Sequence, residues 1–208
     1  MDITQLILDQ HAGQRQLFAY LEEIPRDDLE GLAAVWHQLE NFLLLHAEAE
    51  ELYFYPELAK IGTGGADAPS NTEQITDAIK DHNEIRDAIQ RVRSATVGSD
   101  EWWAAVINAD VANSDHMGEE ERQDLADFRQ QASLELRHEI AVAFLRRQAI
   151  RWEEEKIIRD RDPEQYVDDA ENAPTSDLER AAARLEETQT ATLSSGDPEP
   201  SLRASRTK

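Results

Sequence analysis

The stretch HAEAEELYFYPEL, residues 46–58, carries the pattern that decides the fold. Its His46 and Glu50 are four residues apart, which places them one turn apart on the same face of an α-helix. Apolar residues at three- and four-residue steps, from Leu32 to Phe42, lead into this pair, so the pair continues a stripe that faces a helical core. Because polar groups are costly to bury without a partner, something must pair with both side chains there.

The same arrangement recurs along the chain, with one histidine on each of four predicted helices. The step from His11 to His46 is nearly the same as the step from His82 to His116, and Glu120 follows His116 at the four-residue spacing of His46 and Glu50. Each histidine falls on the apolar stripe of its helix, where a shared cation would offset the cost of burial. The spacing therefore predicts a metal site with the ligands His11, His46, Glu50, His82, His116 and Glu120.

Helical periodicity extends over most of residues 1–159, and Gly and Pro fall between the periodic segments. This predicts an all-α, up-down four-helix bundle with an additional C-terminal helix, in one domain. The expected helices cover residues 3–23, 28–60, 71–98, 100–131 and 133–159, with a Gly-rich loop at 62–70. From residue 160 onward, Asp, Glu, Pro, Ser and Thr dominate, so we expect 160–208 to be an acidic, largely disordered tail that is dispensable for folding and metal binding.

Acidic residues dominate the charge, because 44 Asp and Glu stand against 21 Lys and Arg and the formal net charge is -23. Such a field repels nucleic acids and anionic membranes, so neither is expected as a partner. The absence of cysteine excludes disulfides, zinc thiolates and iron–sulfur clusters, so any metal must be bound by His and carboxylate. No apolar stretch has the length of a membrane span and the first residues lack a signal-peptide pattern, so we expect a cytoplasmic protein.

Two features of the ligand set stay open. Glu119, Glu120 and Glu121 are consecutive, and Glu120 is preferred over Glu121 only for its four-residue step from His116. Tyr53 lies three residues after Glu50 on the same stripe, so its phenol is a further candidate ligand, although packing in the core is the simpler explanation for a buried tyrosine.

The two remaining histidines are expected to bind no metal. His37 precedes His46 by nine residues, which places it on the opposite face of the helix at about 100° per residue. His138 forms a single ExxH motif with Glu135, and the second copy that ferritin-like sites need is missing.

Histidine and carboxylate donors without sulfur suit iron or manganese, with zinc as a further option, and two bridging carboxylates flanked by imidazoles describe a dinuclear site in a bundle core. The pattern resembles the hemerythrin HHE family over about residues 1–130, through His11, His46 with Glu50, Glu51 and the run YFYP at 53–56, His82, and His116 with Glu120. The resemblance implies a non-haem centre of two iron ions, oxo- or hydroxo-bridged, that binds oxygen, peroxide or nitric oxide.

The sequence departs from the oxygen-carrying members of that family, whose third helix supplies two histidines four residues apart and whose fourth supplies HxxxxD. Here residue 78 is Ala and residue 86 is Arg. Each iron would keep an open position, which favours reactivity over oxygen transport. We therefore expect a reaction with oxygen or hydrogen peroxide, with catalase-like disproportionation as its form. The alternative is a protein that binds or senses oxygen, nitric oxide or iron without turnover and contacts a protein partner through its tail.

Overall fold

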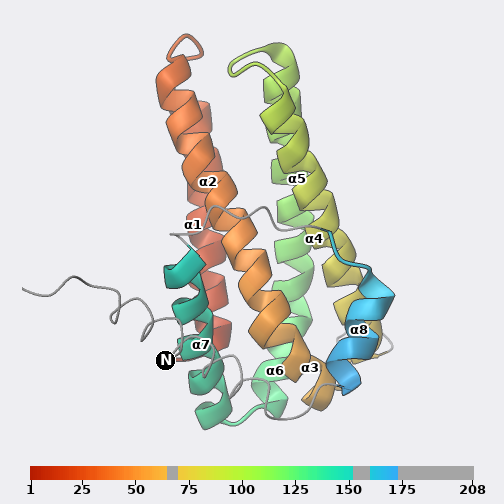
Figure 1. The fold of residues 1–208 in the computed structure, drawn as a ribbon. Helices are drawn as coiled ribbons and strands as arrows, with labels where there is room; N and C mark the ends of the chain where they lie inside the picture. Colours follow the sequence, from red (N-terminus) through yellow and green to blue (C-terminus); the bar gives the residue numbers. More distant parts are fainter. Residues whose placement is uncertain (65–69, 152–159, 173–208) are drawn as a thin grey trace, which may run out of the picture. The chain divides into compact units, whose positions relative to one another are not determined.

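The computed structural model describes residues 1–64, 70–151 and 160–172, and this part of the chain contains helices and no strand (Figure 1). Four long helices run alternately up and down: α1 (Ile3–Glu23), α2 (Leu29–Ala49), α4 (Asn71–Ser94) and α5 (Asp100–Arg122). Helix α1 packs on α2 and α4 packs on α5, with further contacts between α1 and α5 and between α2 and α4. The predicted all-α bundle is confirmed.

Side-chain caps define where the long helices begin. Asp28 accepts a hydrogen bond from the N–H of Gly31 at 2.9 Å, and Ser99 Oγ accepts one from the N–H of Trp102 at 3.1 Å. Asp2 and Ser70 cap α1 and α4 in the same way. Each cap satisfies a backbone donor that the first helical turn leaves without a partner, which typically contributes about 1 kcal/mol.

The second predicted helix is not continuous. After Ala49 the chain forms one π-helical turn, η1 (Glu50–Phe54), before it resumes as α3 (Tyr55–Ile61). In this turn the N–H of Tyr55 bonds to the carbonyl of Glu50, five residues back, which is the mark of a π-helix. The wider turn changes the direction in which all later side chains of this segment point.

The fourth predicted helix is also divided, because Gln123, at φ -113° and ψ -70°, departs from regular α-helical dihedral angles and separates α5 from α6 (Asp124–Gln131). Helix α7 (Leu134–Arg151) follows and packs against α1 and α2, with Ile140 and Phe144 fully buried. The rest of the fifth predicted helix, 152–159, lies outside the described residues, as do 65–69 of the expected loop.

Residues 160–172 correct the expectation of a disordered tail that starts at 160. They contain α8 (Pro163–Asn172), which packs against α3 and α4 and buries Tyr166 and Val167. The Tyr166 hydroxyl donates to the backbone carbonyl of Glu51, and the Arg161 guanidinium pairs with the Glu51 carboxylate. A few specific contacts thus hold this segment against the bundle, although its composition is mostly polar. Residues 173–208 lie outside the described part of the chain.

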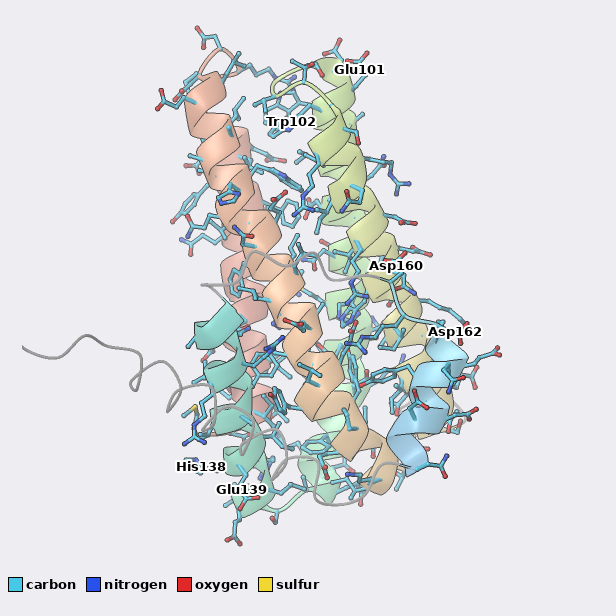
Figure 2. All side chains as sticks on the ribbon, in the orientation of Figure 1. Glu101, Trp102, His138, Glu139, Asp160 and Asp162 are labelled. Carbon is cyan, nitrogen blue, oxygen red and sulfur yellow. The ribbon has the colours of Figure 1, made fainter. Side chains whose placement is uncertain are left out.

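The core has a dry half and a polar half. The dry half lies toward the α1–α2 and α4–α5 connections, where the rings of Trp36 and Trp102 meet edge to face at 6.2 Å among buried Leu, Ile and Val (Figure 2). The polar half holds the histidines described below. None of the described helices combines the length and the apolar character that crossing a bilayer needs.

Candidate metal centre

The four histidines predicted from the spacing meet inside the polar half of the bundle. They come from α1, α2, α4 and α5, and none is more than 3% exposed: His11, His46, His82 and His116. Their Nε2 atoms point inward in two pairs. The Nε2 atoms of His11 and His46 are 3.1 Å apart, and those of His82 and His116 are also 3.1 Å apart.

The outer nitrogen of each ring faces an oxygen atom. Such a contact favours the tautomer with hydrogen on Nδ1, which leaves the lone pair on Nε2 free to bind a metal. The two Nε2 atoms of each pair are only 3.1 Å apart, so their lone pairs repel each other unless a proton or a metal ion lies between them. The Nδ1 partners are Glu121 Oε1 for His11 at 3.0 Å, Gln10 Oε1 for His46 at 2.8 Å, Glu51 Oε1 for His82 at 2.9 Å and Asp81 Oδ2 for His116 at 3.5 Å.

Glu50 lies between the two histidine pairs. Its Oε1 is 2.9 Å from Nε2 of His46, and its Oε2 is 3.3 Å from Nε2 of His82. Both oxygens are buried without a hydrogen-bond partner. A buried carboxylate in this state is costly unless a cation neutralises it, so its surroundings fit a carboxylate that bridges two metal ions.

Glu120 joins one pair only. Its Oε2 is 3.2 Å from Nε2 of His11 and has no hydrogen-bond partner, whereas its Oε1 accepts a hydrogen bond from the Tyr55 hydroxyl at 3.1 Å. Glu121, the other candidate, instead bonds to the outer nitrogen of His11 and to Arg15. Glu120 therefore points toward the donor atoms, whereas Glu121 orients the ring of His11 from outside.

Two overlapping donor groups result. His11, His46, Glu50 and Glu120 form the first group, and Glu50, His82 and His116 form the second. Within each group the donor atoms lie within 4.8 Å of one another, and Glu50 belongs to both. The arrangement can hold two neighbouring cations, with four protein donors for one and three for the other.

The pKa values show in which direction these groups act on one another. Burial opposes ionisation of Glu50, but His46 and His82 hold its pKa well below the usual range. Burial lowers the pKa of His46, as a neutral ligand requires. Burial also acts to lower the pKa of His116, yet its contact with Asp81 and the charges of Glu120 and Glu50 raise it to about 9. A metal ion would displace a proton from this ring.

The interactions described for Tyr53 include none with either donor group, so they do not support its place as a candidate ligand. It is buried, and the charges that act on its hydroxyl are those of Arg147 and Glu48. A continuous α-helix would place Tyr53 on the same stripe as His46 and Glu50, but the π-turn interrupts the α-helical phase. The tyrosine that faces the site is Tyr55, whose ring lies 5.6 Å from that of His82. Irregular turns leave no periodic signal that sequence reasoning can detect.

The other two histidines lie outside the cluster. The side chain of His37 is 72% exposed and lies near Glu40 and Asn41 on α2. His138 is exposed near the N-terminal amine and is labelled in Figure 2 on α7. Neither histidine takes part in the donor groups found among the described residues.

Glu51 is a site residue that the spacing did not single out. It is 2% exposed, bonds to His82 and forms ion pairs with Arg86 and Arg161. Burial acts against its ionisation, but the contact with His82 and the two guanidinium groups lower its pKa to about 2. Arg86, noted as a departure from oxygen carriers, thus fixes the carboxylate that orients His82.

Comparisons with known proteins identify the fold and the family of this chain. The fold is similar to that in the crystal structure of a hemerythrin HHE cation binding domain-containing protein from Mycobacterium kansasii, with a TM-score of 0.57 and 16% identity over 87% of this chain and 99% of that one. No curated protein matches the sequence significantly. Residues 2–128 match the sequence profile of the Hemerythrin HHE cation binding domain, which covers more than half of the chain. The chain therefore belongs to the hemerythrin HHE cation-binding family, whose members are metal-binding helical proteins.

Proposed function

We propose that this protein holds two iron ions in the bundle core and reacts there with hydrogen peroxide or oxygen. One observation carries the proposal: four inward Nε2 atoms lie around three buried carboxylate oxygens without a hydrogen-bond partner, two from Glu50 and one from Glu120, and the two donor groups share Glu50. Without cations this cluster would be a costly set of buried polar atoms. With cations, every one of these atoms has a partner.

The donor set favours iron. Imidazole and carboxylate without thiolate suit iron or manganese, and the cation-binding family is named for hemerythrin. When bound, two iron ions supply a centre that can accept and return two electrons. The chain supplies the rest: Glu51, Asp81, Glu121 and Gln10 orient the rings, and Tyr55 fixes the outer oxygen of Glu120.

Peroxide disproportionation is the reaction that we propose. In it, one H₂O₂ loses two electrons and two protons to become O₂, and a second H₂O₂ gains both to become two H₂O. The second donor group has three protein donors, Glu50, His82 and His116, and residue 78, one turn before His82, is Ala and offers no donor. Open positions beside a redox metal favour reaction with small molecules over a saturated, inert site.

Metal analysis and an oxygen electrode test this proposal. Purified protein should contain two iron ions per chain and should release O₂ after addition of H₂O₂. The matched control is His37→Ala, which changes an exposed histidine on the same helix as His46 and should leave both results unchanged. Reversible oxygenation of the reduced protein, with no O₂ released from peroxide, would restore a carrier or sensor function.

A second candidate function is sensing of oxygen, nitric oxide or iron, and two contacts to Glu51 favour it. Arg161, just before α8, and Tyr166, in α8, both bond to Glu51, which in turn orients His82. Occupancy of the centre could therefore change how firmly the C-terminal segment is held, and this segment could signal to a protein partner. Protease cleavage near residue 160 should then depend on iron or nitric oxide, whereas equal cleavage in all states refutes sensing through this segment.

A further inference from the structure

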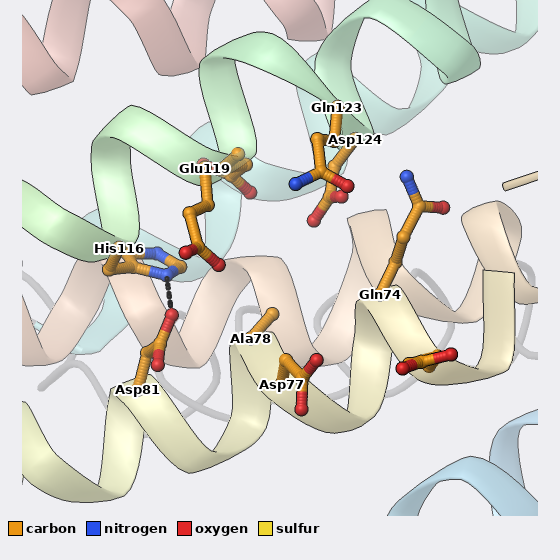
Figure 3. A pocket seen from close by; sticks show the side chains of 10 residues that line it. Gln74, Asp77, Ala78, Asp81, His116, Glu119, Gln123 and Asp124 are labelled. Atoms are coloured by element: carbon orange, nitrogen blue, oxygen red, sulfur yellow. Dashed lines mark ion pairs between the residues drawn. The ribbon is translucent and has the colours of Figure 1, made fainter. Parts of the chain in front are cut away.

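A cavity of about 190 Å³ opens between α4 and α5, beside the candidate metal centre (Figure 3). A space of this size holds several water molecules. Its inner lining includes His116 and Glu120, which are 2% and 1% exposed. The cavity therefore brings solvent next to two donors that are otherwise enclosed by the bundle.

The outer lining of the cavity is acidic. It contains Glu73, Asp77, Asp81 and Glu119, and no Lys or Arg is among the lining residues of the described chain. Among the described residues, Asp77 pairs with the exposed Lys80 at 3.1 Å, and Asp81 contacts His116 at 3.5 Å. Carboxylates grouped around a concave surface concentrate cations there and raise the rate at which they associate.

A second cavity, of about 350 Å³, extends the acidic lining along the same two helices. It shares Asp81 and Glu119 with the first cavity and adds Glu84 and Asp115, with Arg122 as its single basic residue. The carboxylates thus extend from the surface toward His116. Because one of the shared residues, Asp81, contacts Nδ1 of His116, the acidic lining ends at a ring of the second donor group.

Gln74 provides an independent sign that the first cavity receives a polar ligand. Its side chain extends from α4 among the lining residues, as Figure 3 shows, and it is only 5% exposed. Neither its amide oxygen nor its amide nitrogen has a hydrogen-bond partner. Burying an amide with both ends unpaired is energetically costly, and a hydrogen bond to a ligand or to its hydration water would offset this cost. An amide oxygen is a suitable partner for a hydrated divalent cation.

We infer that this cavity is the uptake site through which a hydrated divalent cation, Fe²⁺ under the proposed function, reaches the metal centre. Glu73, Asp77 and Glu119 attract the cation, Gln74 contacts its hydration shell, and the cation passes on to His116 and Glu120. Ala78 keeps the passage open, because it lines the cavity one turn before His82 and its methyl group leaves the space free. This inference rests on the proposed metal site and adds a kinetic role for residues that bind no metal in the final state.

The rate of Fe²⁺ uptake tests the inference. Metal-free protein is mixed with Fe²⁺ without oxygen, and free Fe²⁺ is trapped with a coloured chelator at intervals. The variant Glu73→Gln, Asp77→Asn, Glu119→Gln should take up Fe²⁺ about tenfold more slowly at low salt and should reach the same final occupancy. The difference should shrink at high salt, because screening at about 1 M reduces the Debye length to about 3 Å.

Two further variants complete the design. The control Glu23→Gln, Asp27→Asn, Glu30→Gln makes the same change in net charge at exposed positions near the α1–α2 connection, and it should load at the wild-type rate. Ala78→Leu narrows the passage and should slow uptake at both low and high salt. Uptake by either cavity variant at the control rate overturns the inference, whereas a wild-type chain that binds no Fe²⁺ at all overturns the proposed metal site itself.

Discussion

Replacing His46 with alanine should remove one of the two proposed metal ions and leave the other. The first donor group would keep His11, Glu50 and Glu120, with only one imidazole, whereas the second group of three donors would be unchanged. We therefore expect the iron content to fall from about two ions per chain to about one. The His37→Ala variant should keep both ions, because His37 lies on the exposed side of α2.

The loss should also be visible as reduced thermal stability. A ligand present at 100 times its Kd stabilises the folded state by about 2.7 kcal/mol. For a chain of about 150–250 residues, each kcal/mol changes Tm by about 2–4 °C, so the loss of one ion should lower Tm by about 5–11 °C. Metal analysis and calorimetry at fixed free iron measure the two effects.

His46 also contributes packing, which must be separated from metal binding. Its ring lies 5.9 Å from the ring of Phe144 and its Nδ1 contacts Gln10 at 2.8 Å. The same variants are therefore compared after complete chelation, and the Tm difference that remains is due to packing. If His46→Ala keeps two ions, or if its Tm deficit is as large without metal as with it, the assignment of His46 as a ligand is wrong.

Three other perturbations have defined outcomes. Tyr55→Phe removes the hydrogen-bond donor to Oε1 of Glu120 and should change the visible spectrum of the iron-loaded protein, whereas Tyr53→Phe should leave the spectrum unchanged. A spectral change with Tyr53→Phe alone would contradict the π-turn geometry. A chain that ends at residue 172 should retain its metal. A chain that ends at residue 159 loses two contacts to Glu51 and should release iron about tenfold faster, since a charged hydrogen bond contributes about 1.5–3 kcal/mol. Equal rates of iron release to a chelator would refute this coupling. Ala78→His should keep the iron content and lower O₂ release from peroxide by at least about tenfold, because the new imidazole would occupy an open coordination position. Unchanged O₂ release would show that the reaction does not use this position.

Local periodicity explains why much of the fold and centre could be predicted. Each histidine lies in a continuous α-helix, so counting residues from the apolar stripe gives its direction correctly, as it does for His46 after Leu39. The position of Glu50 follows from the same count, because it is the first residue of the π-turn and still follows helical phase.

The missed features depend on information that periodicity does not contain. Tyr55, which the spacing does not single out, contacts Glu120 after a turn that is wider than an α-helical turn. Glu51 acquires its role from Arg86 and Arg161, which are far away in the sequence. The docking of α8 depends on two apolar side chains, Tyr166 and Val167, whose effect disappears when composition is averaged over 160–208. Tertiary contacts, rather than composition, determine the structure there.

The π-turn has a consequence for how this chain is aligned with its relatives. A π-turn amounts to one extra residue in a helix, and a single residue changes side-chain direction by about 100°. A relative with one residue fewer between Glu50 and Pro56 would form a regular helix and would turn a different aromatic residue toward the bridging carboxylates. In this segment the number of residues therefore decides which tyrosine lies near the bridging carboxylates. A sequence alignment that pairs tyrosines across such a length difference would match side chains that point in different directions.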